Sequence, residues 1–205
     1  MSYIAASRAP CGLFLRRRLA RGPIRASMLY GLVLAPAAIL ATLQPAEAGG
    51  FVSEIKGGVL AHDVGGLWAQ GSREERWVDL NVEVMFRPVL AVFGGQLSPA
   101  LGANINTSGD TSSIYLDARW QYETPSGFFF GLGLGVAVHD GERHLVDFDR
   151  KALGSQVLFH IPFEFGMRLD AHNSLSVYFE HMSNGELADE NEGLDRLGVR
   201  YGYRF

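Results

Sequence analysis

Apolar and polar side chains alternate strictly along several segments of the chain, each about ten residues long. From residue 78 to residue 86 the even positions are all apolar, while the odd positions include Asp79, Asn81 and Glu83. Residues 114–122 repeat the pattern, with Asp117 and Arg119 on the polar side. Because side chains alternate across a β-strand with period two, each segment predicts a strand with one apolar face and one polar face.

Two further segments make the contrast between the faces stronger. Between residues 128 and 139 the even positions carry large apolar side chains, whereas the odd positions include Gly131, Gly133 and Gly135. Between residues 157 and 169 the odd positions are apolar and oppose His160, Glu164 and Arg168. A soluble sandwich would bury the apolar faces and expose the charged ones, and the alternation by itself is compatible with it.

The whole pattern predicts an all-β fold, an eight-stranded antiparallel transmembrane β-barrel with apolar side chains outward and polar side chains inward. The expected strands span residues 51–61, 75–87, 97–107, 112–123, 127–139, 155–169, 174–183 and 194–205. A barrel of this size has an interior filled by side chains, so a transport pore is not expected. The inward charged residues are expected to pair with one another: Asp79, Glu83, Asp117, Arg119, Glu164, Arg168, Glu180 and Arg200.

The chain begins with features of a secretory signal peptide. Arginines are concentrated before residue 26, an apolar run covers residues 28–43, and Ala46-Glu47-Ala48 follows. That run is shorter than the roughly 20 residues that a membrane-spanning helix needs. We therefore expect a cleaved signal peptide over residues 1–48 and a barrel domain over residues 49–205. The sole cysteine, Cys11, would leave with the signal, so no disulfide is expected.

The expected mature domain is acidic. The complete chain has a formal charge of −4, and six of its arginines lie in the expected signal peptide: Arg8, Arg16, Arg17, Arg18, Arg21 and Arg25. A nucleic-acid partner is therefore not expected.

The connections between strands predict the orientation of the barrel. The polar stretches 62–74, 107–112, 140–154 and 184–193 are expected outside the cell, and residues 123–126 and 170–173 in short periplasmic turns.

The stretch 88–96 is too apolar for an ordinary turn, so it either extends a strand or lies at the membrane interface. Four arginines lie in or beside the expected external loops: Arg73, Arg76, Arg143 and Arg150. They are candidates to contact the phosphates of lipid A, and the alternative is that they are ordinary solvated loop charges.

The final strand indicates a bacterial outer membrane. Leu197, Val199, Tyr201, Tyr203 and Phe205 alternate with arginines and glycines. Aromatic residues near one strand end are typical of the girdle at a membrane interface. A terminal Phe after alternating aromatics also resembles the signal by which outer-membrane proteins are recognised for insertion.

The candidate catalytic residues lie in the last two strands. His181 and Ser183 extend the apolar row of Leu175, Val177 and Phe179, and Asp195 belongs to the apolar row of the next strand. A hairpin centred on residue 189 would bring Ser183 opposite Asp195. The three residues would then form a nucleophile, a base and an orienting acid on the lipid-facing wall near the extracellular rim. Asn184 and the backbone N–H of Gly185 are candidates for the oxyanion hole. A structural role at a polar strand end is the alternative.

Other chemistry finds little support in the sequence. The segment Gly131-Leu132-Gly133-Leu134-Gly135 lies within a strand pattern and no helix follows it, unlike a dinucleotide-binding loop. The remaining histidines have no ligand spacing typical of zinc sites. We expect no metal and no cofactor.

The C-terminal hairpin resembles that of the outer-membrane lipid A 3-O-deacylases, the PagL-like acyloxyacyl hydrolases. The similarity rests on His181-x-Ser183-Asn184, on Asn191-x-Gly193-x-Asp195 and on the closing residues 200–205, with weaker similarity at 106–110 and 137–142. It implies a metal-free serine esterase that removes an ester-linked 3-hydroxyacyl chain from lipopolysaccharide. It assigns Ser183 as nucleophile, His181 as base and Asn184 to the oxyanion hole.

The third catalytic residue differs from the family pattern. The best-known members have a glutamate where this chain has Asp195, one methylene shorter, so Glu192 is an alternative acid. Two other functions stay open: a non-catalytic small barrel such as an adhesin or structural protein, and an esterase or acyltransferase acting on phospholipid. The expected partners are lipopolysaccharide and outer-membrane lipids, and the sequence leaves open whether the barrel forms a homodimer.

Overall fold

The structure is a computed structural model that describes residues 50–69 and 75–205. The expected signal peptide, residues 1–48, lies outside the described residues. Within them, no helix is both long enough and apolar enough to cross a membrane.

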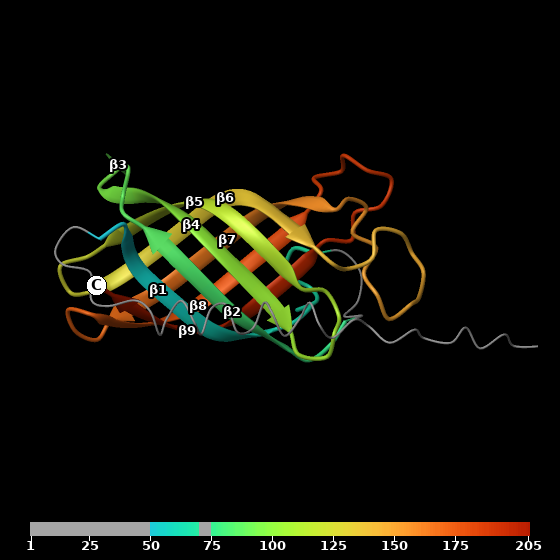
Figure 1. Cartoon of the computed structure of the whole chain (residues 1–205), viewed down its shortest axis with the longest axis horizontal. Helices are drawn as coiled ribbons and strands as arrows, with labels where there is room; N and C mark the ends of the chain where they lie inside the picture. The colour runs from blue at the N-terminus through green and yellow to red at the C-terminus, as the bar shows by residue number, and fades with distance from the viewer. Residues whose placement is uncertain (1–49, 70–74) are drawn as a thin grey trace, which may run out of the picture. The chain divides into compact units, whose positions relative to one another are not determined.

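Nine strands account for the regular structure of the described residues (Figure 1). They are β1 (Val52–Ala61), β2 (Val78–Phe86), β3 (Leu90–Val92), β4 (Gly95–Asn106), β5 (Ser113–Glu123), β6 (Phe128–His139), β7 (Val157–Arg168), β8 (Asn173–Ser183) and β9 (Leu194–Arg204). Eight of them agree with the predicted strands to within a few residues. The additional strand, β3, falls in the apolar stretch 88–96.

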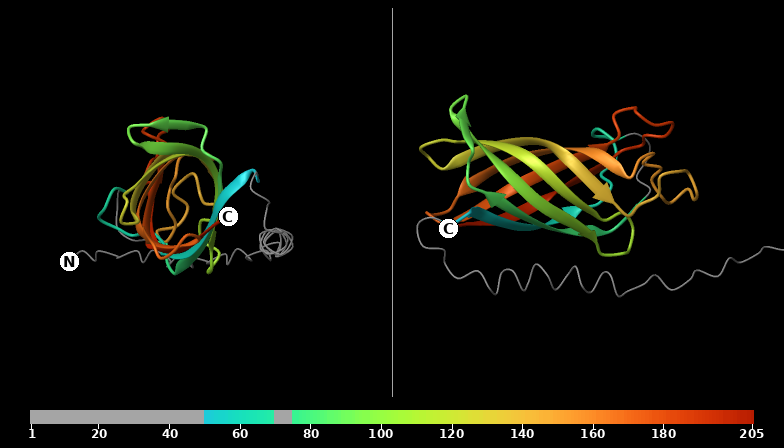
Figure 2. Two further views of the ribbon diagram at one scale, coloured as in Figure 1. Left: turned by 90° about the vertical axis from the view of Figure 1, so that its left-hand side faces the viewer. Right: turned by 45° about the horizontal axis from the view of Figure 1, so that its top comes forward.

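The strands close into a barrel. Each of the eight long strands pairs antiparallel with its neighbours in the chain, β2 pairs with β4, and β1 pairs with β9 to complete the ring. Figure 2 shows the closed ring of strands from one end. The predicted eight-stranded antiparallel barrel is therefore confirmed.

The two faces of the barrel wall invert the pattern of a water-soluble protein. Along β7, Phe159 and Phe165 face outward and are exposed, whereas His160 and Glu164 face inward and are buried. Along β5, Leu116 is exposed while Arg119 is buried. A sandwich would bury the apolar row instead, so the soluble alternative is excluded. Burial of the charged row and exposure of the apolar row match a barrel whose solvent is lipid.

Glycines on β6 make room for the charged side chains of β5. A Cβ atom on Gly135 would lie 2.1 Å from Asp117 Oδ1, and a Cβ atom on Gly133 would lie 2.7 Å from Arg119 Cδ. Both distances are too short for real atoms, so the glycine row is a packing requirement of the crowded interior. The predicted crowding of the lumen is confirmed at these positions.

The buried charges pair with one another, as predicted. Glu164 Oε2 accepts hydrogen bonds from Lys56 Nζ at 2.8 Å, Arg119 Nη2 at 3.0 Å and Arg200 Nη2 at 2.8 Å. Each charge therefore has an oppositely charged partner inside the barrel, which offsets the large cost of removing it from water.

The histidine of the lumen bridges two carboxylates. His160 lies between Asp117, 2.8 Å from Nδ1, and Glu180, 3.0 Å from Nε2. Carboxylates only accept hydrogen bonds, so both bonds form only when the ring carries both protons.

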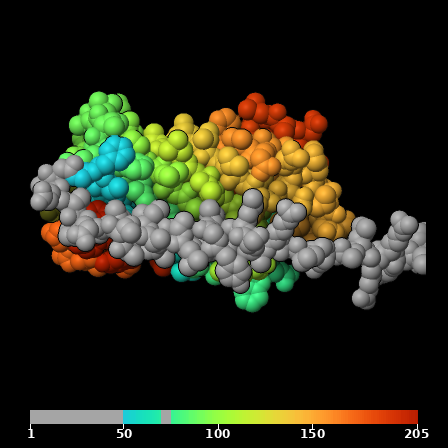
Figure 3. Space-filling model, in the orientation of Figure 1, coloured from blue at the N-terminus to red at the C-terminus, as the bar shows by residue number. Residues whose placement is uncertain are grey.

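The two ends of the barrel differ. One end, which we call the loop end, carries the connections β1–β2, β4–β5, β6–β7 and β8–β9. Figure 3 shows the β6–β7 and β8–β9 loops packed against each other at this end. The other end, the turn end, carries the short turns after β5 and β7 and the C-terminus (Figure 1).

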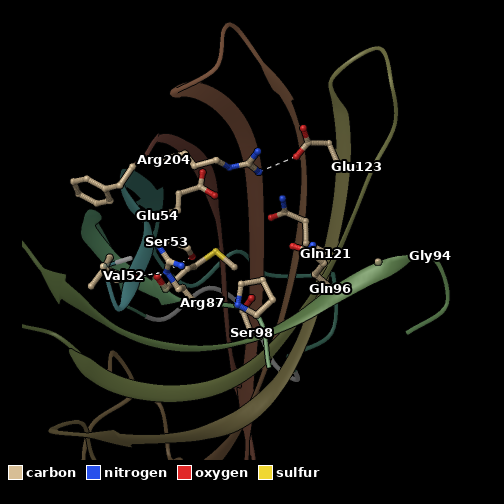
Figure 4. A pocket seen from close by; sticks show the side chains of 15 residues that line it. Val52, Ser53, Glu54, Arg87, Gly94, Gln96, Ser98, Gln121, Glu123 and Arg204 are labelled. Atoms are coloured by element: carbon tan, nitrogen blue, oxygen red, sulfur yellow. Dashed lines mark hydrogen bonds and ion pairs between the residues drawn. The ribbon is translucent and has the colours of Figure 1, made fainter. Parts of the chain in front are cut away.

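The stretch 88–96 extends the sheet at the turn end. β3 forms a hairpin with β4, with Leu90 opposite Leu97 and Val92 opposite Gly95, and in the end-on view it lies outside the ring of strands (Figure 2). A polar pocket of about 710 Å³ opens at this end between the start of β1 and the start of β4, lined by Glu54, Arg87, Gln96 and Arg204 among others (Figure 4). The pairing confirms the first explanation that the sequence left open, since the stretch extends the sheet.

Candidate active site

His181, Ser183 and Asp195 form a hydrogen-bonded chain at the loop end of β8 and β9. His181 Nε2 lies 2.9 Å from Ser183 Oγ, and His181 Nδ1 lies 2.6 Å from Asp195 Oδ1. Since the carboxylate only accepts, Nδ1 carries the proton of this bond, and the neutral ring then presents the lone pair of Nε2 to the serine hydroxyl. This is the arrangement in which a serine can be deprotonated by histidine.

The register of the hairpin differs from the predicted one. Asp195 lies opposite His181, not opposite Ser183. The prediction placed the centre of the loop one residue too late along the chain, and this shifts the pairing by two residues. A two-residue shift leaves every side chain on the same face, so His181 and Asp195 stay on the rows of Val177 and Val199.

The shorter acid reaches the histidine because of this register. A directly opposed pair on neighbouring strands has Cβ atoms about 4.5–5.5 Å apart, which suits the short side chain of Asp195. Glu192, the alternative acid, is engaged elsewhere: its Oε2 accepts a hydrogen bond from the backbone N–H of Ala152 at 2.5 Å. The geometry therefore favours Asp195 as the partner of His181.

The first loop, between β1 and β2, contributes contacts that the sequence did not predict. The backbone N–H groups of Trp68 and Ala69 donate to Asp195 Oδ2 at 2.6 and 2.8 Å. The indole ring of Trp68 stacks on the imidazole of His181, with centroids 4.4 Å apart and an angle of 7° between the planes. Neither contact has a signal in the sequence, because a loop has no periodicity from which its folding over a strand could be inferred.

A pocket of about 330 Å³ lies beside Ser183 on the outward face of the wall. It is lined by Trp68, Phe159, Ile161, His181, Ser183, Gly185, Glu186, Asn191, Glu192 and Gly193. Phe159 and Ile161 belong to β7, where they lie directly opposite Ser183 and His181. The pocket is thus apolar on the β7 side and polar on the side of the β8–β9 loop.

Asn184 holds the loops together and does not face the pocket. Its Nδ2 donates to the carbonyl oxygens of Leu153 and Glu190 at 3.0 and 2.6 Å, which occupies both amide hydrogens. Its Oδ1 accepts from Leu187 N at 3.1 Å, and its backbone N–H donates to Asn191 Oδ1 at 2.9 Å. The expectation that Asn184 donates to an oxyanion conflicts with this geometry, because the side chain has no hydrogen left to donate.

Gly185 and Asn191 remain beside Ser183. Both residues line the pocket, and Asn191 Nδ2 lies 3.2 Å from Glu186 Oε1, an exposed hydrogen bond. Asn191 was quoted in the sequence motif but was given no role. Gly185 adopts φ +65°, a conformation that favours glycine at this sharp turn after Ser183.

A buried polar network closes the loop end above the site. His62 Nε2 lies 2.8 Å from Glu75 Oε2, and its Nδ1 lies 2.8 Å from Asp79 Oδ2. Burial alone would lower the pKa of His62, but the hydrogen bonds to Asp79 and Glu75 outweigh burial and raise it. Burial alone would raise the pKa of Glu75, yet its bonds to His62 and Thr111 and the nearby Arg150 lower it to about 2.

The arginines expected to contact phosphates differ in their surroundings. Arg150 is paired within the loops, 3.4 Å from Glu75 and 3.2 Å from Asp110, and Arg73 lies outside the described residues. Arg76 and Arg143 are exposed. In residues 50–69 and 75–205, no cluster of histidine, cysteine or acidic side chains has the geometry of a metal site.

Comparison with known proteins identifies relatives over most of the chain. Residues 51–204 match the family model described as "Lipid A 3-O-deacylase (PagL)". The chain is 28% identical over 191 residues to the lipid A deacylase PagL of Bordetella bronchiseptica, covering 86% of this chain and 95% of that protein. The crystal structure of the outer membrane enzyme PagL superimposes with a TM-score of 0.56 at 18% identity, covering 75% of this chain and all of that one.

Proposed function

The chain belongs to the lipid A 3-O-deacylase (PagL) family, and we propose that it hydrolyses the ester-linked 3-hydroxyacyl chain of lipid A by a serine mechanism. It is a hydrolase acting on lipid A and resides in the outer membrane. One observation supports the choice of residues most strongly: the unbroken hydrogen-bonded chain Ser183–His181–Asp195 beside the outward-facing pocket.

The outward direction of this chain suits a substrate that is itself a membrane lipid. His181 and Asp195 continue the rows of exposed apolar side chains formed by Val177 and Val199. We infer that the loop end is extracellular, so that the pocket opens sideways into the outer leaflet, where lipid A lies. A charged pair costs little near the membrane interface, and the loop amides bonded to Asp195 lower the cost further.

In the proposed reaction His181 Nε2 takes the proton of Ser183 while Oγ attacks the carbonyl carbon of the ester. The tetrahedral intermediate collapses when the alcohol oxygen of lipid A leaves and takes the proton from His181. Water then attacks the acyl-enzyme with His181 again as base. The products are the 3-hydroxy fatty acid and the partly deacylated lipid A, and Ser183 regains its proton.

The oxyanion that forms in each step needs hydrogen-bond donors. Asn184 is replaced in this role because both hydrogens of its amide are occupied. We assign the role to the backbone N–H of Gly185 and the side-chain amide of Asn191, since both residues line the pocket beside Ser183. Phe159 and Ile161 would contact the acyl chain from the opposite side.

Mass spectrometry of lipid A from bacteria that express the protein tests the proposal. The wild-type protein should remove one 3-hydroxyacyl chain, and the Ser183→Ala variant should remove none. Ser126→Ala, the same change at an exposed position in the turn after β5, is the matched control and should behave as wild type. Unchanged lipid A with the wild-type protein would contradict the proposal, and loss of acyl chains from phospholipid alone would indicate the other lipid substrate.

A further inference from the structure

The first loop contacts two members of the triad at once, through residues that no part of the family motif includes. We propose that Trp68, with the backbone of Ala69, is a positioning element of the active site that fixes Asp195 and supports the charged form of His181. This inference rests on the proposed function, because it assigns a role within the same reaction.

The backbone N–H groups of Trp68 and Ala69 hold the carboxylate of Asp195 in place. Asp195 is fully buried, and its Oδ2 accepts the N–H groups of Trp68 and Ala69, while Oδ1 faces His181. The backbone carbonyl of Asp195 also accepts a hydrogen bond from Val64 N at 3.0 Å. With both ends of the carboxylate engaged, the side chain cannot rotate away from the imidazole. Fixed orientation of this kind accounts for a large part of enzymatic rate enhancement.

The indole ring of Trp68 supports the charged form of His181. It lies flat against the imidazole, with the two ring centroids 4.4 Å apart and an angle of 7° between the ring planes. During catalysis the imidazole gains a proton, and the face of an aromatic ring attracts a cation. The attraction is present after proton transfer and weaker before it, so it favours the transition state over the resting enzyme. An aromatic residue that served only as a membrane anchor would have no reason to stack in parallel on the catalytic base.

A spectroscopic test needs no substrate. The chain has 3 tryptophans, so the double variant Trp77→Phe/Trp120→Phe leaves Trp68 as the sole indole reporter. A protonated imidazole in contact with an indole quenches its emission. The emission of Trp68 should therefore be weaker in acid buffer, where an imidazole carries a proton, than in alkaline buffer. The difference should persist with Ser183→Ala and disappear with His181→Ala.

A kinetic test separates positioning from general packing. Trp68→Ala should lower kcat about tenfold or more while KM changes less than about threefold, and Trp68→Phe, which keeps a flat ring, should restore most of the rate. Leu67→Ala, an exposed neighbour in the same loop, is the matched control and should keep the wild-type rate.

The outcomes distinguish the two proposals. Equal rates for Trp68→Ala and Leu67→Ala would overturn the role of Trp68, and so would a Trp68 emission that His181→Ala leaves unchanged. If the wild-type protein hydrolysed no lipid A, the proposed function would fail, whereas the emission measurement would still decide whether Trp68 contacts the charged imidazole.

A second inference comes from the opposite end of the barrel and is independent of catalysis. The tip of the β3–β4 hairpin exposes Val89, Leu90 and Phe93, which are 69%, 55% and 92% accessible. The other two turns at this end, residues 124–127 and 169–172, expose a single large apolar side chain, Leu169. The hairpin is held to the wall by Trp120, whose Nε1 donates to the carbonyl of Val92 at 2.9 Å.

We infer that this hairpin is an anchor that inserts its apolar tip into the phospholipids of the periplasmic leaflet. The hairpin continues β4, whose outward side chain Leu101 belongs to the apolar wall, and in Figure 2 it lies outside the ring of strands. Exposed apolar side chains that continue the apolar wall beyond the end of a barrel are suited to a membrane interface.

A fluorescent label tests the anchor. In a Cys11→Ser background, an environment-sensitive dye on Phe93→Cys should show blue-shifted emission in phospholipid vesicles and quenching by lipids brominated near the headgroup. The matched control is Ala171→Cys, an exposed position in the polar turn after β7, where the dye should report water. Equal, water-like emission at both positions would overturn the anchor.

Discussion

His181 and Asp195 face each other across β8 and β9, with Nδ1 of the imidazole 2.6 Å from Oδ1 of the carboxylate. In the mechanism that we propose, this pairing lets Asp195 orient the base at the position where the family resemblance implies a glutamate. Direct opposition in the ladder brings the two Cβ atoms close, so no additional methylene is needed to reach the imidazole.

The pairing predicts the effect of replacing the acid. Asp195→Asn has nearly the same shape, but its amide can donate to Nδ1 and so favours the wrong tautomer of His181. We expect kcat to fall by about 10²–10⁴-fold with little change in the unfolding midpoint. Asp195→Glu should also lose activity, because the longer side chain displaces the carboxylate from the N–H groups of Trp68 and Ala69. Full activity of Asp195→Asn would show that another acid, such as Glu192, orients the base.

The lumen network predicts a large effect on stability at a site remote from Ser183. Glu164 is the shared partner of Lys56, Arg119 and Arg200. Glu164→Ala would leave buried cations without their central anion, and we expect the free energy of unfolding to fall by about 3–5 kcal/mol. Glu142→Ala, at an exposed position in the β6–β7 loop, is the control and should change it by less than about 0.5 kcal/mol. Urea titration of the refolded barrel in lipid vesicles measures both.

Strand alternation predicted the barrel once the signs of export and the absence of a helix to cover a sheet were added to it. Side chains have a fixed period of two, so the exposed row of β7 and the buried Glu164 could be read directly from the sequence. Charge pairing in the lumen followed, because inward charges in a closed barrel have only one another as partners. The predicted register of β8 and β9 was wrong by two residues. A ten-residue loop need not be symmetric about its middle residue, so the middle residue does not determine which residues of the two strands lie opposite each other.

The surroundings of the triad could not be predicted, for a different reason. Trp68 and Ala69 are more than a hundred residues from Asp195 in the chain, and the contact depends on how the first loop folds over the wall. Asn184 was placed in the oxyanion hole by resemblance, but its hydrogen bonds go to the carbonyls of Leu153 and Glu190. Loop conformations depend on such tertiary contacts, which leave no periodic pattern in the sequence.

The network of His62 and Glu75 predicts a pH window for the stability of the loop end. The pKa of His62 is raised above 6.5, so its contribution is complete below pH 6.5 and is lost as the pH rises through the folded value. The pKa of Glu75 is lowered from 4.5 to about 2, so its contribution is complete above pH 4.5 and is lost as the pH falls toward 2. Together they give greatest stability between pH 4.5 and 6.5.

Thermal unfolding of the wild-type barrel and of single variants across this range measures the effect. Glu75→Gln should remove most of the loss of stability at acid pH, which is at most about 3 kcal/mol in the free energy of unfolding. His62→Gln should remove the loss of stability at alkaline pH. Asp149→Asn, at an exposed position in the β6–β7 loop, is the control and should leave the pH dependence unchanged on both sides. A wild-type stability that is flat from pH 3 to pH 8 would contradict the proposed ionic pairing.

Gly193 supports the site through its lack of a side chain. It adopts φ +68°, and a Cβ atom there would lie 3.1 Å from His181 Cε1 and 3.2 Å from the carbonyl oxygen of Met182. Gly193→Ala should therefore cost about 1–2 kcal/mol in backbone strain and also push the imidazole away from Ser183. Because small displacements of a catalytic group are costly, we expect kcat to fall about 10–100-fold.

Gly109→Ala provides the matched control for this prediction. Gly109 has a similar φ of +85°, but nothing lies within 4 Å of a Cβ atom built on it. The two variants should thus lose similar stability, and only Gly193→Ala should lose activity on lipid A. Because the backbone strain is common to both, an activity difference isolates the contact with His181. Equal activities would mean that the imidazole can shift without consequence, which the short hydrogen bonds to Ser183 and Asp195 argue against.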